Sequence, residues 1–209
     1  SEVIFFRQGG NNTDVESANG PVGITAAQAF GRTSPTQELV DAFPMLDGKA
    51  ITDPASGYDP LNPYNNRDPR LQMNILYNGA PWVNTIIETF EGGANKPGGA
   101  TQQTKTGYYM RKFMGNFESA TQYSSTSHDW IYFRYAEMLL NYAEAQNEFA
   151  GPSEDVYQAL AQLRRRAGIT EGTDGGFGLK PGMSRDEMRA TIRNERRVEL
   201  AFEEHRFWD

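Results

Sequence analysis

The chain has 209 residues, a formal net charge of −7 and an isoelectric point near 5.0, which argues against bulk nucleic-acid binding because phosphate contacts need a basic surface. Apolar residues make up 38% of the chain, enough for a core, whereas 21 glycines and 11 prolines predict long irregular connections. The absence of cysteine excludes disulfides, thiolate zinc sites and a cysteine nucleophile. No stretch reaches the roughly 18–20 apolar residues of a bilayer span, so we expect this chain by itself to be soluble.

Residues 1–129 predict a loop-rich part with short strands. The apolar run at residues 3–6 (VIFF) is expected to form a short buried strand or turn. Residues 35–43 predict a helical turn, for which Thr36 is a candidate cap because its hydroxyl can accept from a first-turn amide.

The middle of the chain predicts loops around a short β-ribbon. Residues 53–70 hold four prolines, which forbid a continuous helix or a central strand. Residues 71–77 alternate apolar and polar side chains, which indicates a strand, and residues 85–90 are its expected partner. Residues 91–107 predict a flexible polar surface loop, and residues 108–113 a short extended segment.

Residues 130–209 predict the helical part of the molecule. A first helix is expected to start at Trp130, capped by Ser127 or Asp129, and to stop at Gly151. A second helix is expected from Ser153, with Val156, Leu160 and Leu163 on one face, ending at Gly168. Two helices joined by so short a turn predict an antiparallel hairpin.

A third helix is expected to begin at Ser184, where Ser184 and Glu187 have the spacing of a capping box, and to continue to about Phe202. The predicted fold class is therefore mainly α: a helical hairpin and a C-terminal helix, with long irregular loops and a short β-ribbon. The aromatic residues on these helices or at their ends are expected in the core: Trp130, Tyr132, Phe133, Tyr135, Tyr142, Phe202, Phe207 and Trp208.

Several separated motifs follow one another along the chain: residues 66–71 (NRDPRL) and 76–79 (LYNG), residues 134–145 (RYAEMLLNYAEA) and 163–168 (LRRRAG), and residues 192–203 (IRNERRVELAFE) and 205–209 (HRFWD). With residues 35–43 (PTQELVDAF), this set resembles the SusD/RagB family of outer-membrane nutrient-capture lipoproteins from Bacteroidota. The likeness corresponds to the C-terminal portion of that family. We therefore expect the chain to be a fragment of a SusD-like helical-repeat fold that lacks the N-terminal repeat half. Because the chain stops just after Phe207 and Trp208, which are expected to pack, we also expect it to be truncated there.

The resemblance implies a non-catalytic protein that binds an oligosaccharide or another nutrient at the cell surface, without a cofactor, and delivers it to a SusC-like TonB-dependent transporter in the outer membrane. It also implies that the parent protein is anchored through a lipid on a cysteine that this chain lacks. Two alternatives remain open. In one, this half docks on the transporter and the ligand is held elsewhere. In the other, the protein is a glycosidase that uses two acidic residues.

Most candidate chemical groups have a structural explanation beside the functional one. Glu195 and Glu199 have the spacing of an acid–base pair, but a network of ion pairs with nearby arginines such as Arg193, Arg196 and Arg134 is the favoured interpretation. Three further groups are weaker candidates: the two histidines His128 and His205 for a triad, Asp53, Asp59 and Asp68 for a metal site, and residues 164–166 (RRR) for anion binding. The favoured explanation of the aspartates is hydrogen bonding within turns, and that of residues 164–166 is a favourable interaction with the helix C-terminus. No catalytic or metal-binding residue is therefore predicted.

Aromatic residues in loops are the better candidates for ligand contacts, because a flat exposed ring can stack on the apolar face of a sugar while neighbouring amides bond the hydroxyl groups. The predicted glycan-binding residues are Trp82, Tyr58, Tyr64, Asn66 and Tyr108. The alternative for each aromatic residue, and for Tyr109 and Tyr123, is that the ring pins its own loop onto the core.

Overall fold

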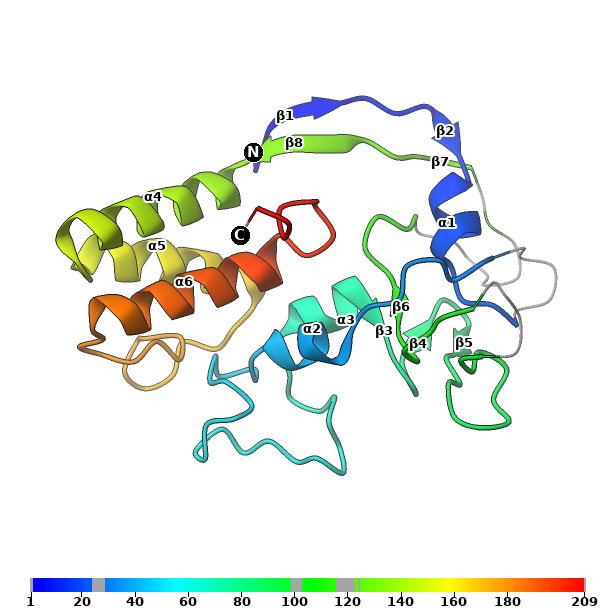
Figure 1. Cartoon of the computed structure of the whole chain (residues 1–209), viewed down its shortest axis with the longest axis horizontal. Helices are drawn as coiled ribbons and strands as arrows, with labels where there is room; N and C mark the ends of the chain where they lie inside the picture. Colours follow the sequence, from blue (N-terminus) through cyan, green and yellow to red (C-terminus); the bar gives the residue numbers. More distant parts are fainter. Residues whose placement is uncertain (1, 24–28, 99–102, 116–122, 124, 209) are drawn as a thin grey trace. The chain divides into compact units, whose positions relative to one another are not determined.

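The computed structural model describes residues 2–23, 29–98, 103–115, 123 and 125–208, and these ranges hold six helices and eight short strands (Figure 1). The chain forms two compact units. The helical unit comprises Ser1–Phe5, Asp41–Leu71 and Phe133–Asp209, and the strand-and-loop unit comprises Phe6–Val40 and Gln72–Tyr132. Residues 41–71 therefore belong with the C-terminal helices, although they lie far from them in the sequence.

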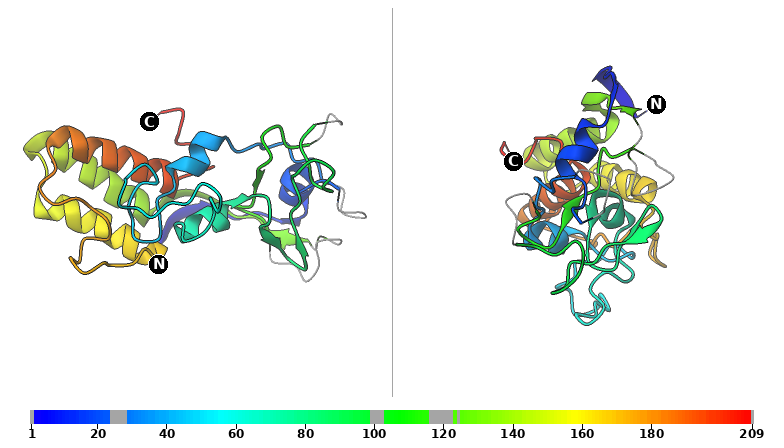
Figure 2. Two further views of the ribbon diagram at one scale, coloured as in Figure 1. Left: turned by 90° about the horizontal axis from the view of Figure 1, so that it is seen from below. Right: turned by 90° about the vertical axis from the view of Figure 1, so that its right-hand side faces the viewer.

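The predicted helical hairpin is present in the helical unit as α4 (Tyr135–Ala150) and α5 (Glu154–Ala167), and α6 (Arg185–Glu199) lies against α4 (Figures 1 and 2). Gly151 ends α4 with a φ of 85°, and Gly168 ends α5 in the left-handed conformation with a φ of 87°. Both glycines stand where side-chain-bearing residues would be strained, which is why the two stop signals in the sequence are reliable.

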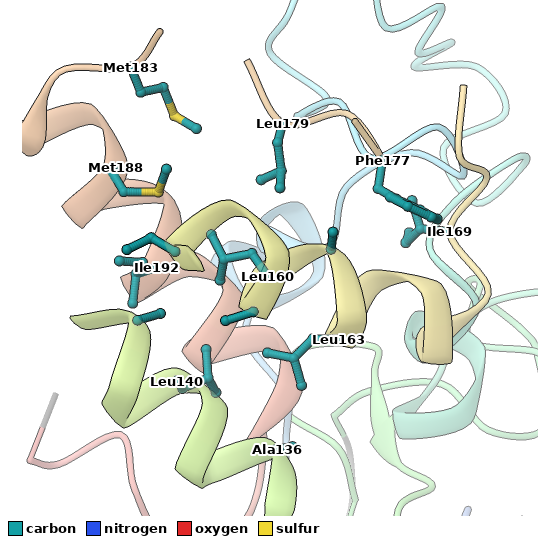
Figure 3. Packing of buried hydrophobic residues seen from close by; sticks show 14 of the residues in the cluster. Ala136, Leu140, Leu160, Leu163, Ile169, Phe177, Leu179, Met183, Met188 and Ile192 are labelled. Atoms are coloured by element: carbon teal, nitrogen blue, oxygen red, sulfur yellow. The ribbon is translucent and has the colours of Figure 1, made fainter. Parts of the chain in front are cut away.

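The core of this unit is formed by one apolar face of each helix. Leu140 of α4, Leu160 and Leu163 of α5, and Met188 and Ile192 of α6 are all nearly inaccessible to solvent and belong to one cluster (Figure 3). The spacing of the buried positions follows the helical repeat, as the sequence predicts.

The start of α6 is as predicted. The Ser184 hydroxyl accepts a hydrogen bond from the Glu187 amide, and the Glu187 carboxylate accepts one from the Ser184 amide at 2.8 Å. The helix nevertheless ends at Glu199, and residues 200–204 form turns, so the expected continuation to Phe202 is wrong. Phe207 and Trp208 beyond it are 85% and 83% exposed, which corrects their expected place in the core.

The first helix of the hairpin begins five residues later than predicted. Residues Trp130–Arg134 form strand β8, which pairs with β1 (Val3–Arg7), and Ser127 lies in β7 (Thr126–Ser127), which pairs with β2 (Asn11–Asn12). Neither Ser127 nor Asp129 caps α4, because Arg134 occupies the cap position. Aromatic and β-branched residues such as those of β8 favour extended backbone, and the paired strand stabilises it.

Several apolar residues expected to be buried are exposed instead. Ile4, Phe5 and Phe6 of β1 form the predicted strand, but each is about half exposed, and so are four aromatic residues near or on α4: Tyr132, Phe133, Tyr135 and Tyr142. The reason on α4 is geometric. Ala136, Leu140, Ala143 and Asn147 occupy the face toward α5 and α6, and the two tyrosines of this helix lie on the opposite face.

The strand-and-loop unit holds α1 (Asp14–Asn19) and short strand pairs around a second apolar cluster. Helix α2 (Gln37–Ala42) begins as predicted, since the Thr36 hydroxyl accepts from the Leu39 amide at 3.3 Å. The predicted strand at 71–77 is wrong for most of its length, because Pro69–Asn74 form helix α3 and only Ile75–Leu76 form β3.

The pairing of the predicted ribbon also differs. Strand β3 pairs antiparallel with β6 (Tyr109–Met110), in the segment expected to be extended. The segment expected as its partner contains β5 (Thr85–Ile86), which instead pairs with β4 (Pro81–Trp82) across a tight turn. No helix within the described ranges combines the length and the apolar character that a bilayer crossing requires.

Candidate functional site

A largely buried cluster of arginines and carboxylates, of which Arg166 is exposed, joins residues 68–70 and α5 to α6. We call it the arginine–carboxylate cluster; it consists of Asp68, Arg70, Arg134, Arg164, Arg166, Glu195 and Glu199. Glu195 is 2% exposed, and its two carboxylate oxygens accept from Arg70 Nη1 at 2.7 Å and from Arg164 Nε at 2.8 Å. Asp68 holds the other edge of the Arg70 guanidinium, with Nη2 to Oδ2 at 2.7 Å.

Glu199, one helical turn further along α6, is paired even more fully. Its carboxylate accepts from Arg70 at 2.8 Å, from Arg134 at 2.5 Å and from Arg166. Arg134 also donates to the backbone carbonyl of Glu199 at 2.7 Å and to the carboxylate of Glu203, so it ties the start of α4 to the end of α6.

The electrostatics of these carboxyl groups are those of a structural network. Burial by itself raises the pKa of Glu199, but Arg134, Arg70 and Arg166 outweigh burial and bring this pKa to about 2. Burial likewise opposes ionisation of Glu195, yet Arg70 and Arg164 lower its pKa below the ordinary value. A glycosidase needs one carboxyl group with a raised pKa to act as the acid, and neither member of this pair provides it.

The predicted ion network is therefore confirmed, with different partners from those expected. Arg196 donates to the Asn141 side chain and lies 3.6 Å from Glu144. Arg134 does reach Glu199, as expected. Residues 164–166 lie at the end of α5, as predicted, but Arg164 and Arg166 also form ion pairs with Glu195 and Glu199.

The aspartates considered for metal binding have turn or ion-pair roles. Asp53 and Asp59 accept from the amides of Ala55 and Leu61, two residues further on, at 2.8 and 2.9 Å, and Asp68 belongs to the cluster above. In the part of the chain that the structure describes, no group of three or more histidine and acidic residues is placed to hold a metal ion. His128 pairs with buried Glu16 at 3.1 Å in the strand-and-loop unit.

Three of the five predicted glycan-binding residues lie together on the loop at residues 53–70 of the helical unit. Tyr58 and Tyr64 are half-buried and Asn66 is exposed. Buried Arg67 contacts this loop at two points. Its guanidinium lies 5.5 Å from the centre of the Tyr58 ring and donates to the Pro63 carbonyl, and it also donates to the Phe43 carbonyl outside the loop. The loop therefore presents two partly accessible rings beside amide side chains.

The other two predicted residues belong to the strand-and-loop unit and are buried there. Trp82 is 3% exposed and packs with Leu76, Ile87 and Tyr109. Tyr108 is 7% exposed, and its hydroxyl donates to the Gln37 side chain at 2.7 Å. These surroundings match the alternative role in which a loop aromatic anchors its own segment to the core.

A groove of about 660 Å³ opens beside this loop, entirely within the helical unit. Its wall depends on a close approach between two turns: a Cβ on Gly48 would lie 2.1 Å from the Phe177 carbonyl oxygen, and a Cβ on Gly178 would lie 2.4 Å from the Gly48 carbonyl carbon. Arg164 joins the same turns, since Nη1 donates to the Phe177 carbonyl at 2.9 Å and to the Gly48 carbonyl at 3.3 Å.

The groove is lined by three segments that are remote in sequence. They are residues 44–54, which lead into the predicted glycan-binding loop, the connection at 178–183, and α6 with α5 beneath it. The polar side chains that line it are Lys49, Thr52, Asp53, Arg164, Lys180, Thr191 and Asn194. Our sequence interpretation missed this groove, although glycines 48 and 178, each followed within two residues by a lysine, were a signal for it.

Comparison with known proteins gives consistent matches over this fold. The sequence profile of the SusD family matches residues 1–209. The chain is 39% identical over 84 residues to SusD-like protein P2 of Formosa agariphila, an alignment that covers 40% of this chain and 17% of that protein.

Two solved structures are similar over almost the whole chain. A SusD-like carbohydrate binding protein from Bacteroides fragilis NCTC 9343 has a TM-score of 0.78 at 26% identity, covering 100% of this chain and 40% of that one. A SusD-like protein from the same strain has a TM-score of 0.73 at 29% identity, covering 99% and 42%. The chain thus spans about two fifths of the length of these solved relatives.

Proposed function

Because this chain belongs to the SusD family, we propose that it forms part of a non-catalytic protein that binds an oligosaccharide. The similarity to a solved carbohydrate binding protein over the full length of this chain supports the ligand class. The observation that carries the proposal is the loop at residues 53–70, where two partly accessible tyrosine rings stand next to polar side chains.

The chemistry of this loop suits a sugar. The C–H face of a pyranose can pack on the Tyr58 or Tyr64 ring, while Asn66 and its neighbours donate to and accept from the hydroxyl groups. Arg67 fixes the orientation of the loop, because three observed contacts join it to Tyr58, Pro63 and Phe43. Trp82 and Tyr108 are left out of the proposed contact surface, since their rings are buried.

A titration of a panel of neutral and acidic oligosaccharides tests this assignment. We expect Tyr58→Ala with Tyr64→Ala to weaken binding about tenfold, which corresponds to about 1.4 kcal/mol. The matched control is Tyr142→Ala, which removes a similarly exposed ring from α4 in the same unit and should leave the affinity unchanged. Equal affinities for the double variant and the unaltered chain would remove the two tyrosines from the site.

We extend the proposal to the cellular role that the family resemblance implies. The parent protein is proposed to be lipid-anchored at the outer-membrane surface, where it delivers the oligosaccharide to a SusC-like TonB-dependent transporter. Co-purification of the parent with such a transporter, lost when the transporter is deleted, would support this role. Normal uptake of the oligosaccharide in cells that lack the parent would contradict it.

A second candidate function, docking on a protein partner, is favoured by the outer face of α4. Tyr135, Met138, Tyr142 and Phe149 lie on one stripe of this helix, and Phe149 is 87% exposed. Tyr142→Ser with Phe149→Ser should then reduce capture of the transporter while oligosaccharide affinity is retained. Unchanged capture would dismiss this face as the docking surface.

A further inference from the structure

The groove beside the loop at 53–70 carries an excess of positive charge in a chain whose net charge is −7. Of its charged lining residues, Lys49, Arg164 and Lys180 are positive and Asp53 is negative. Lys49 is held at 2.6 Å by Asp47, and Arg164 by Glu195 in the buried cluster. Lys180 is exposed and forms no ion pair with any residue that the structure describes, so its ammonium group is available to a ligand.

The groove differs in kind from the neighbouring aromatic loop. Among the described residues that line it, none is aromatic, so stacking cannot be its way of holding a sugar. Its lining instead offers the Lys180 ammonium group, the Lys49 ammonium group beside Asp47, the hydroxyls of Thr52 and Thr191, and the Asn194 amide. Donors that outnumber carboxylates on a concave surface favour a ligand that brings its own negative charge.

We propose that this groove binds the anionic group, a carboxylate or a sulfate, of an acidic oligosaccharide whose neighbouring sugar unit packs on the tyrosines of the loop. Asp53 and Pro54 line the groove and begin the loop, so we expect one short oligosaccharide to reach from the groove to the loop. The inference rests on the proposed function and narrows its ligand class to acidic saccharides.

Calorimetric titration of the whole chain with three oligosaccharides of equal length tests the proposal: one neutral, one built from uronic acids, and one sulfated. We expect at least one acidic oligosaccharide to bind about tenfold more tightly than the neutral one, with a preference that declines as salt is raised. Which acidic form binds more tightly identifies the anionic group. Lys49→Ala with Lys180→Ala should abolish the preference and change the affinity for the neutral oligosaccharide less than about twofold.

Two further variants separate charge from structure. Lys49→Arg with Lys180→Arg keeps both charges and should keep the preference. Lys105→Ala removes one positive charge from the strand-and-loop unit and should leave binding unchanged. Equal binding of neutral and acidic oligosaccharides, or a preference that survives the double alanine variant, would overturn this inference and leave the proposed function standing. Failure of all three oligosaccharides to bind would overturn both.

Discussion

The two units of the molecule hold irregular segments in place by different means. In the helical unit, the polar groups that are buried are mainly charged, and guanidinium groups join carboxylates on α6 to residues 68–70. In the strand-and-loop unit, buried Glu16 pairs with His128, but the other buried polar side chains that the structure describes are neutral: the Asn95 amide donates to the Val22 carbonyl at 2.6 Å, and the Tyr109 hydroxyl donates to the Asn95 carbonyl at 2.8 Å.

This difference follows from what surrounds each segment. Three packed helices provide fixed positions for long side chains, so a planar guanidinium can meet two or three carboxylates with good geometry. Short strand pairs offer no such frame, and a compact amide or hydroxyl that bonds directly to the backbone is sufficient. The helical unit should therefore be sensitive to loss of charge, and the strand-and-loop unit to loss of packed volume.

The largest expected effect is the removal of one carboxylate from the cluster. Glu195→Ala leaves Arg70 and Arg164 buried without their shared partner, and we expect a loss of about 3–5 kcal/mol in the free energy of unfolding. Denaturant unfolding measures it. The control is Arg189→Ala, which breaks exposed pairs with Glu148 and Asp186 and should change the free energy of unfolding much less, because solvent screens exposed pairs. Similar losses for the two variants would contradict the contrast between buried and exposed pairs.

The matching experiment compares two tryptophans, Trp82 in the strand-and-loop unit and Trp208 in the helical unit. Trp82→Ala removes a buried ring from the cluster around Tyr109 and should cost about 3 kcal/mol. Trp208→Ala removes a ring that is 83% exposed and should change stability by less than about 0.5 kcal/mol. If the exposed tryptophan proved as important as the buried one, the distinction between core and surface aromatics drawn here would fail.

The pH dependence of stability tests the arginine–carboxylate cluster of the helical unit through Glu199. The pKa of Glu199 is lowered from 4.5 to about 2 in the folded chain, so its stabilising effect is fully present above pH 4.5 and is lost as the pH falls toward 2. This loss should be about 3 kcal/mol and should be absent in Glu199→Gln, once the lower stability of that variant is subtracted. Parallel stability–pH curves for the two proteins below pH 4.5 would show that Glu199 does not titrate in this way.

The smallest effect concerns the wall of the groove. Gly178 and Gly57 both have positive φ, 76° and 67°, but only at Gly178 would a Cβ meet backbone atoms. Gly57→Ala should lower the free energy of unfolding by about 1 kcal/mol through backbone strain alone. Gly178→Ala should lower it by about 1–2 kcal/mol more, and only Gly178→Ala should weaken the binding of acidic oligosaccharides. Thermal unfolding of the pair measures the difference, and equal costs would mean that the two turns are free to separate.

Much of the helical unit could be predicted because its signals are local. Gly151, Gly168 and the Ser184–Glu187 capping box fix three helix ends without reference to the rest of the chain. The start of α4 could not be located in this way, since residues 130–134 become extended by pairing with a strand near the N-terminus. Pro69 did carry a local signal for α3, because proline suits the first position of a helix, but the alternation that follows it suggested a strand.

The candidate site was predictable only in part. The tyrosines of the loop at 53–70 were selected as loop aromatics, and they remain partly accessible in the structure. The same criterion also selected Trp82 and Tyr108, whose burial depends on distant partners. The groove is assembled from residues 44–54, 178–183 and α6, so no single stretch of sequence contains it.

The central claim is that the chain holds a saccharide without reacting with it. Equilibrium dialysis of the whole chain against a labelled oligosaccharide panel, followed by mass spectrometry of the recovered ligand, tests both parts at once. We expect saturable retention of at least one oligosaccharide and its recovery at full length. Shortened products, or no saturable retention of any member of the panel, would contradict it.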